Sequence, residues 1–180
     1  SFPMHQPNLR GLSWWQETIP KLLTFLTPVQ NTLIQTVLEE QSEFAQTELY
    51  QSLPYGPAHC DLFRDNVLFD GTYEQPRMGG LIDFYFAGCD TWLFDVAISL
   101  NDWCIHRNTG AFDMEKATAW LQAYAEIRPF TEAEQHAWPL VLQAAALRFW
   151  VSRLYDYFLP RPAQTLKPHD PRHFEIVLQA

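Results

Sequence analysis

Apolar side chains recur at helical spacing through most of this chain, which predicts a mainly helical fold. The clearest case begins at residues 27–30 (TPVQ), which combine the spacing of a capping box with proline in the first helical turn. Apolar residues then return every three or four positions until Pro54. The same reasoning predicts one helix that begins at Ser13 and further helices over 27–53, 92–106, 113–127 and 131–157. A last helix is expected to begin at Asp170-Pro171.

The pattern changes to short strands between residues 55 and 86. Two apolar runs, 67–69 and 80–82, flank Asp70-Gly71, a dipeptide typical of tight turns. A loop at 74–77 that contains proline completes a β-hairpin. We therefore predict one α+β domain over residues 1–180, mainly α with a short β-hairpin. Its extended lead-in ends near residue 11, and the prolines at 160, 162 and 168 predict an irregular segment.

Composition restricts what this domain can bind. With 47% hydrophobic and 18% charged residues, the 180-residue chain has enough apolar side chains for a core. Its 12 Lys and Arg against 21 Asp and Glu give a net charge of −9, which repels nucleic acid and anionic membrane surfaces. A substrate that carries phosphate would therefore need a metal cation or a concentrated group of arginines to offset this charge.

The three cysteines, Cys60, Cys89 and Cys104, have neither the even number of a disulfide framework nor CxxC spacing. Cys104 and His106, taken with the 59–60 pair, match no zinc pattern either. No stretch approaches the roughly 18 apolar residues of a membrane span, and the first ten residues lack the features of a signal peptide. We therefore expect a cytoplasmic protein with no membrane or nucleic-acid partner.

One region carries residues suited to chemistry: 59–66 reads HCDLFRDN, and the predicted hairpin is followed by Asp83-Phe84. Phosphoryl transfer needs chiefly an acceptor for the proton of the attacking hydroxyl, and oxygen ligands for Mg²⁺ on the phosphates. Asp61 can supply the acceptor. Strand pairing can bring Asp83 beside Asn66, so that both face one cation. The spacing therefore fits a site for Mg²⁺ bound to phosphate groups.

Other functions are possible for these residues, but each leaves some of them without a role. An isolated aspartate in a loop is usually a turn former or a helix cap. A hydrolase that uses Asp61 and Asp83 as a carboxylate pair would leave Asn66 and Asp95 without a task. A binding module without catalytic activity would leave the intact set of Asp61, Asn66 and Asp83 unexplained.

The same residues resemble the catalytic loop and metal-binding aspartate of the protein-kinase-like fold, in the form used by aminoglycoside phosphotransferases, choline kinases and homoserine kinases. Asp95-Val96-Ala97 follows at a distance typical of the members that act on small molecules, in which that aspartate braces the catalytic loop. The wider sequence is most similar to bacterial homoserine kinases of the aminoglycoside-phosphotransferase-like family. The similar segments are 10–15, 59–71, 80–85, 94–104, 148–155 and 169–171.

This resemblance implies the fold of a C-terminal kinase lobe and ATP- and Mg²⁺-dependent phosphorylation of the side-chain hydroxyl of L-homoserine, a step of threonine biosynthesis. It implies Asp61 as the catalytic residue and Asn66 and Asp83 as metal ligands. His59 and Asp95 would be structural supports of the catalytic loop. Choline or an aminoglycoside remains an alternative acceptor. The candidates for binding the amino and carboxylate groups of homoserine are Asp102, Trp103, Arg64, Arg148 and Arg153.

Two parts of a kinase are absent from this sequence. Its seven glycines form no G-x-G-x-x-G loop, and Lys21, Lys116 and Lys167 lie outside any strand before the catalytic loop. In the resembling family these parts form an N-terminal nucleotide lobe, which would precede Ser1. We therefore expect the 180 residues to be a C-terminal lobe that folds, is inactive alone, and exposes a face prone to self-association.

Overall fold

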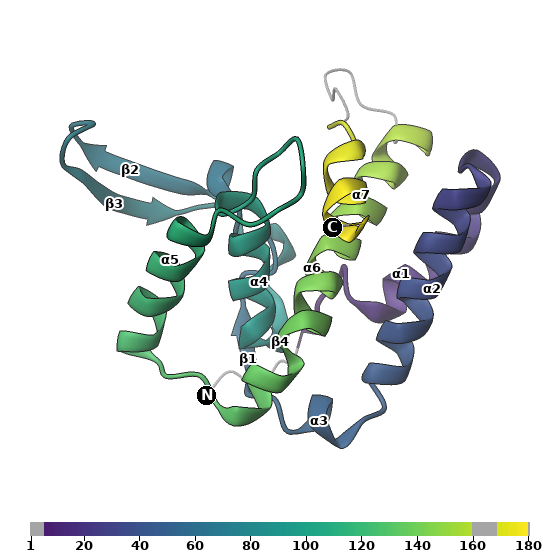
Figure 1. Cartoon of the computed structure of the whole chain (residues 1–180), viewed down its shortest axis with the longest axis horizontal. Coiled ribbons are helices and arrows are strands. Elements are labelled where there is room, and N and C mark those ends of the chain that lie inside the picture. Colours follow the sequence, from purple (N-terminus) through teal and green to yellow (C-terminus); the bar gives the residue numbers. More distant parts are fainter. Residues whose placement is uncertain (1–5, 160–168, 180) are drawn as a thin grey trace.

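The computed structural model, shown in Figure 1, describes residues 6–159 and 169–179. It confirms the predicted class, because it is mainly helical with small antiparallel sheets. The helices are α1 (Leu12–Leu22), α2 (Pro28–Phe44), α3 (Glu48–Gln51), α4 (Trp92–Trp103), α5 (Met114–Ile127), α6 (Glu132–Phe158) and α7 (Arg172–Gln179). The strands are β1 (Tyr55–Ala58), β2 (Val67–Gly71), β3 (Pro76–Leu81) and β4 (Gly88–Thr91). The prolines at 160, 162 and 168 lie outside the described residues.

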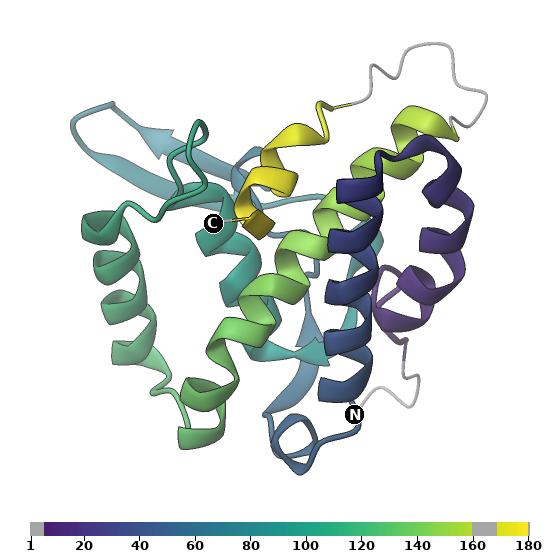
Figure 2. The same cartoon turned by 45° about the vertical axis from the view of Figure 1, so that its right-hand side comes forward.

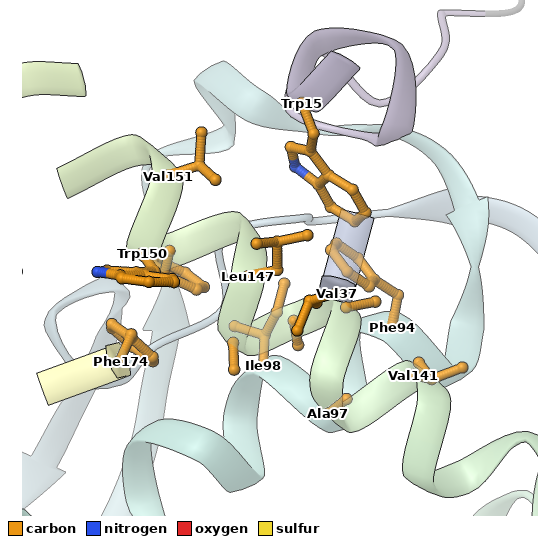
Figure 3. Close-up of a cluster of buried hydrophobic side chains, with 14 of the residues drawn as sticks. Trp15, Val37, Phe94, Ala97, Ile98, Val141, Leu147, Trp150, Val151 and Phe174 are labelled. Carbon is orange, nitrogen blue, oxygen red and sulfur yellow. The ribbon is translucent and has the colours of Figure 1, made fainter. Parts of the chain in front are cut away.

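The long helix α6 lies at the centre of the helical body and packs against α1, α2, α3, α4 and α7. Figure 2 shows it crossing the body diagonally, with α1 and α2 (purple and blue) on one side and α4 and α5 (teal and green) on the other. Leu147 and Trp150 of α6 are fully buried in a cluster that also contains Trp15, Ile98 and Phe174 (Figure 3). In the described parts of the chain, no helix is long and apolar enough to cross a membrane.

Most helices begin where local side-chain chemistry predicts. The capping boxes at Thr27 and Thr131 are confirmed. Each threonine side chain accepts a hydrogen bond from the backbone N–H three residues on, and each threonine backbone N–H donates to the side chain of that residue, Gln30 or Glu134. Asp113 caps α5 in a similar way. The capping box predicted at Ser13 is wrong. The first helix starts one residue earlier, after Gly11, which makes no side-chain capping bond.

The prediction that the second helix continues to residue 53 is also wrong. α2 ends at Phe44, and Thr47 starts the separate short helix α3 by accepting a hydrogen bond from Tyr50 N at 3.2 Å. The Thr47 hydroxyl donates in turn to the carbonyl of Phe44 at 2.7 Å. Because a threonine side chain can take over backbone groups in this way, the helix is interrupted although the apolar spacing continues.

The predicted hairpin is confirmed as β2 and β3, which pair antiparallel with one bulge and project away from the helical body (Figure 1). Its strands are longer than predicted. β2 runs through Asp70-Gly71 and β3 begins at Pro76, so the connection covers 72–75 rather than 74–77. Gly71 has φ +94°, and a side chain there would clash with the carbonyl of Gln75.

A second small sheet, formed by β1 and β4, has no counterpart among the predicted elements. β1 contains Gly56 and Pro57, residues that favour turns in a single sequence. Gly56 is needed in this strand because a Cβ at its position would lie 2.9 Å from Nε1 of Trp92. The sheet matters for the site, since the catalytic loop follows β1 directly and α4 follows β4 directly.

Candidate active site

The predicted catalytic loop, residues 59–66, is anchored to α4 through Asp95. The backbone N–H groups of His59 and Cys60 donate to the two carboxylate oxygens of Asp95 at 2.6 and 2.7 Å. Cys60 has φ +60°, a left-handed conformation that is costly for a residue with a Cβ. Burial raises the pKa of Asp95, while these two hydrogen bonds oppose the rise. Asp95 therefore lies where it can brace the loop and stabilise this backbone conformation.

His59 connects the catalytic loop to the end of the hairpin. Its Nε2 donates to the carbonyl oxygen of Ile82 at 2.9 Å, and its ring packs against Phe84 with centroids 4.6 Å apart. Asp83 lies between these two contacts and, like Cys60, has φ +60°. His59 is 6% exposed and its Nε2 is bonded to the backbone, which fits the supporting role that the resemblance implies.

Asn66 and Asp83 approach Asp61 from the loop and from the hairpin. Nδ2 of Asn66 donates to the backbone carbonyl of Asp61 at 2.8 Å, which leaves the side-chain oxygen of Asn66 for another partner. The carbonyl of Asn66 accepts from Ile82 N at 3.0 Å and so holds the two segments together. Asp83 is exposed, forms no ion pair with any described residue, and lies close enough for its charge to act on Asp61.

This donor set suits Mg²⁺ bound together with a nucleotide. No group of three or more His, Cys, Asp or Glu side chains that could hold a metal ion by themselves occurs in the described residues. Mg²⁺ usually takes one or two protein carboxylates and completes its shell with water and substrate phosphates. The oxygens of Asn66 and Asp83 therefore fit a magnesium ion that arrives with ATP.

Asp61 is paired with a buried arginine from the central helix. Oδ1 of Asp61 lies 2.8 Å from Nη2 of Arg148, and the two side chains are 9% and 4% exposed. Burial raises the pKa of Asp61 and the positive charge of Arg148 opposes this rise. The Arg148 guanidinium also lies over the ring of Phe149 at 4.1 Å and near that of Phe86 at 5.2 Å. This packing fixes the guanidinium beside Asp61.

Asp61 and Arg148 line a cleft of about 790 Å³. Among the described residues, six arginines and five aspartates line the cleft, so the lining is more positive than the protein as a whole, which has a net charge of −9. The arginines in the lining are Arg10, Arg64, Arg107, Arg148, Arg153 and Arg172. Sequence reasoning assigned no binding role to Arg10, Arg107 or Arg172.

The structure places most of the predicted substrate-binding residues at this cleft. Arg64 donates from both its backbone N–H and Nε to Oδ2 of Asp102, at 2.8 Å each. Arg153 donates from Nη1 to the carbonyl of Asp170 at 3.1 Å. Trp103 is not in the cleft lining; it lies instead beside Arg64 and the exposed ring of hairpin residue Phe69.

The contact between Arg148 and Asp61 also lies outside what local motifs predict. A usable signal was present, however, because Arg148 interrupts the apolar run 144–151 (AAALRFWV) in the middle of a helix. A charged residue at a core position usually has a buried partner of opposite charge. The sequence could therefore have assigned Arg148 an internal carboxylate, but not a particular one.

The chain belongs to the phosphotransferase enzyme (APH) family, whose model matches residues 1–130. Its curated relatives include the homoserine kinases of Burkholderia cenocepacia (strain HI2424) and Paraburkholderia phymatum, each 54% identical over 182 residues. The homoserine kinase of Burkholderia ambifaria is 53% identical. Each match covers 99% of this chain but only 55 or 56% of the relative, so the chain spans about half the length of these kinases.

Proposed function

We propose that this chain is the catalytic and acceptor-binding C-terminal lobe of an ATP-dependent kinase that phosphorylates the side-chain hydroxyl of L-homoserine. The observation that carries the proposal is the approach of Asn66 and Asp83 to Asp61, whose carboxylate lines a cleft that contains several arginines. The relatives, which are named homoserine kinases, support homoserine as the acceptor. The three cysteines are free thiols, which suits the reducing environment of the cytoplasm.

In this proposal Asp61 orients the homoserine hydroxyl and accepts its proton as the hydroxyl oxygen attacks the transferred phosphorus. A carboxylate whose pKa is raised by burial is a stronger proton acceptor than an exposed one. Arg148 holds that carboxylate in place through the 2.8 Å ion pair. The brace from Asp95 fixes the backbone just before Asp61, so the carboxylate needs little rearrangement to reach the substrate.

Asn66 and Asp83 would hold Mg²⁺ with the phosphates of ATP. The ion would supply positive charge against the negative charge of the transferring phosphoryl group. Asp83 contributes a full charge from an exposed carboxylate, whereas Asn66 contributes a neutral oxygen held in place by its bond to the Asp61 carbonyl.

The hairpin offers a surface for the rest of the nucleotide site. Its large apolar side chains are unusually exposed for a folded domain, which suits burial by an additional lobe or by the nucleotide. The exposed residues on and just after the hairpin are Leu68, Phe69, Tyr73, Met78, Leu81, Ile82, Phe84 and Tyr85. We propose that an N-terminal lobe, of the kind that the resemblance to kinases implies, covers this face, with self-association of the chain as the alternative.

A hybrid kinase tests the proposed function. This chain would replace the aligned 182-residue region of the Burkholderia cenocepacia homoserine kinase, and ATP turnover would be followed by a coupled assay. We expect turnover with L-homoserine, little with choline or kanamycin, and none from the 180-residue chain alone. A folded hybrid that prefers choline or kanamycin would reject the proposed acceptor, and turnover by the chain alone would reject the need for a second lobe.

A further inference from the structure

The arginines of the cleft divide into those with a carboxylate partner and those without. Arg148 is paired with Asp61, and Arg64 is paired with Asp102. Arg107 and Arg153 form no ion pair with any described residue, and we call them the outer arginine pair. Neither guanidinium is therefore held by a carboxylate of the described residues, and the two positive charges act on each other.

The side chain of His173, on α7, lines the same cleft and lies within electrostatic reach of Arg153 and Arg107. Burial lowers the pKa of His173, and the charges of Arg153 and Arg107 lower it further. The buried Nδ1 of this ring has no hydrogen-bond partner in the described part of the chain. Arg107, Arg153 and His173 thus line one cleft and act on each other electrostatically, while Asp102, Asp170 and Asp65 oppose part of that positive charge.

Arg153 is fixed more firmly than a surface arginine. Its guanidinium lies 4.5 Å over the ring of Phe174, and Nη1 donates to the carbonyl of Asp170. Burial lowers the pKa of Arg153, and Arg107 adds to that effect. Like charges held together in a partly buried cleft repel each other, and an anion placed between them relieves that repulsion.

Arg148 and Arg153 both extend from α6 into the lining of the same cleft. Arg148 marks the reaction end because it touches Asp61, and Arg153 lies five residues further on, about 7.5 Å along the helix axis. In homoserine, four bonds separate the hydroxyl oxygen from the carboxylate carbon, about 5 Å when extended. Since an arginine side chain can reach back several ångströms, a homoserine hydroxyl at Asp61 would place its carboxylate within reach of Arg153.

We propose that the outer arginine pair, Arg107 and Arg153, binds the carboxylate of the acceptor and thereby selects amino-acid alcohols over alcohols without a carboxylate. This proposal rests on the proposed function for the position of the hydroxyl at Asp61. In this proposal Arg148 and Arg64 bind their aspartate partners and not the carboxylate of the substrate. Arg107, which no motif in the sequence indicates, is added as a substrate-binding residue. Choline and aminoglycosides, which carry cationic groups in place of a carboxylate, would meet two unneutralised positive charges here.

Calorimetry on the 180-residue chain tests the carboxylate site with three small ligands. L-Homoserine carries both groups, L-2-aminobutyrate has the carboxylate without the hydroxyl, and 3-aminopropan-1-ol has the hydroxyl without the carboxylate. We expect both carboxylates to bind and the amino alcohol to bind at least tenfold more weakly. Arg107→Gln and Arg153→Gln should each weaken both carboxylates about tenfold or more and leave the amino alcohol unchanged.

Two further variants separate this effect from misfolding and from simple loss of charge. Arg77→Gln removes the same charge from an exposed position on the hairpin, outside the cleft, and should change nothing. Arg153→Lys keeps the charge but loses the planar fork, so it should fall between wild type and Arg153→Gln. Arg107 is exposed, so its variant tests the site without disturbing buried packing.

The outcomes distinguish this proposal from the proposed function. Unchanged carboxylate affinity in both glutamine variants, or no carboxylate binding by the wild-type chain, would overturn the outer arginine pair as the binding site. If L-2-aminobutyrate binds in a manner that depends on Arg107 and Arg153 while the hybrid kinase does not phosphorylate homoserine, the carboxylate site stands and the proposed function falls.

Discussion

Around α6, regular helices bury large apolar side chains such as Leu147 and Trp150, both 0% exposed. At the candidate site, the chain instead buries the charges of Asp61 and Arg148 between short strands and loops. Two residues with side chains there adopt left-handed backbone conformations, which are absent from the helices. The stability of the helical body thus comes from the burial of apolar side chains. The loop at the candidate site has an unfavourable backbone conformation, which is stabilised by hydrogen bonds from the helical body.

The largest expected effect lies in the helical core. Trp150→Ala removes a fully buried ring and should lower the free energy of unfolding by about 3–5 kcal/mol, because it leaves a cavity beside α6. Met78→Ala, on the exposed hairpin, should stay within about 0.5 kcal/mol of wild type. Urea denaturation followed by circular dichroism measures both. Equal losses in the two variants would show that the hairpin shares the stabilising role of the core.

The next effect concerns the metal and belongs to the site alone. In the hybrid kinase, Asp83→Ala should raise the Mg²⁺ concentration needed for half-maximal turnover about tenfold or more, since it removes a full negative charge. Asn66→Ala should raise it less, because a neutral oxygen is lost. Stability should change little with Asp83→Ala, as that carboxylate is exposed. A Mg²⁺ requirement that Asp83→Ala leaves unchanged would mean that the metal site lies elsewhere.

The smallest effect is a pH dependence at the outer end of the cleft. Because the folded state lowers the pKa of His173 below 6.5, the unfolded chain binds the proton more readily, and His173 reduces stability as the pH falls through this range. Wild type should therefore lose more stability than His173→Gln between about pH 7.5 and about pH 5.5, by less than about 1 kcal/mol. Denaturant titrations at the two pH values provide the comparison. A smaller loss in wild type would contradict the lowered pKa.

How far the sequence predicted this molecule depends on how local each cause is. The capping boxes at Thr27 and Thr131 and the hairpin at Asp70-Gly71 rest on contacts within a few residues, so the sequence predicted them. Thr47 also acts locally, but the apolar pattern around it hid the break that it makes. The β1–β4 sheet depends on pairing between distant segments, and β1 has no strand pattern of its own.

The candidate site shows the same difference between features with local causes and features that depend on distant segments. The proximity of Asp61, Asn66 and Asp83 could be predicted from their spacing, because the hairpin brings its own two ends together. The contact of Asp61 with Arg148 and the arrangement of the outer arginine pair depend on how α6 and α7 pack beside the loop. No short motif records that packing, so these partners emerged only from the structure.

The most direct test of the account is the turnover of Asp61→Asn in the hybrid kinase. Because Asp61 is proposed to accept the proton of the hydroxyl, kcat for homoserine should fall by about 10² or more. Arg148 loses its buried partner in this variant, so circular dichroism must first establish that the protein is folded at the assay temperature. Asp70→Asn, the same substitution on the exposed hairpin, should retain normal turnover. Near-normal kcat in a folded Asp61→Asn hybrid would contradict the central claim that this loop is the catalytic centre.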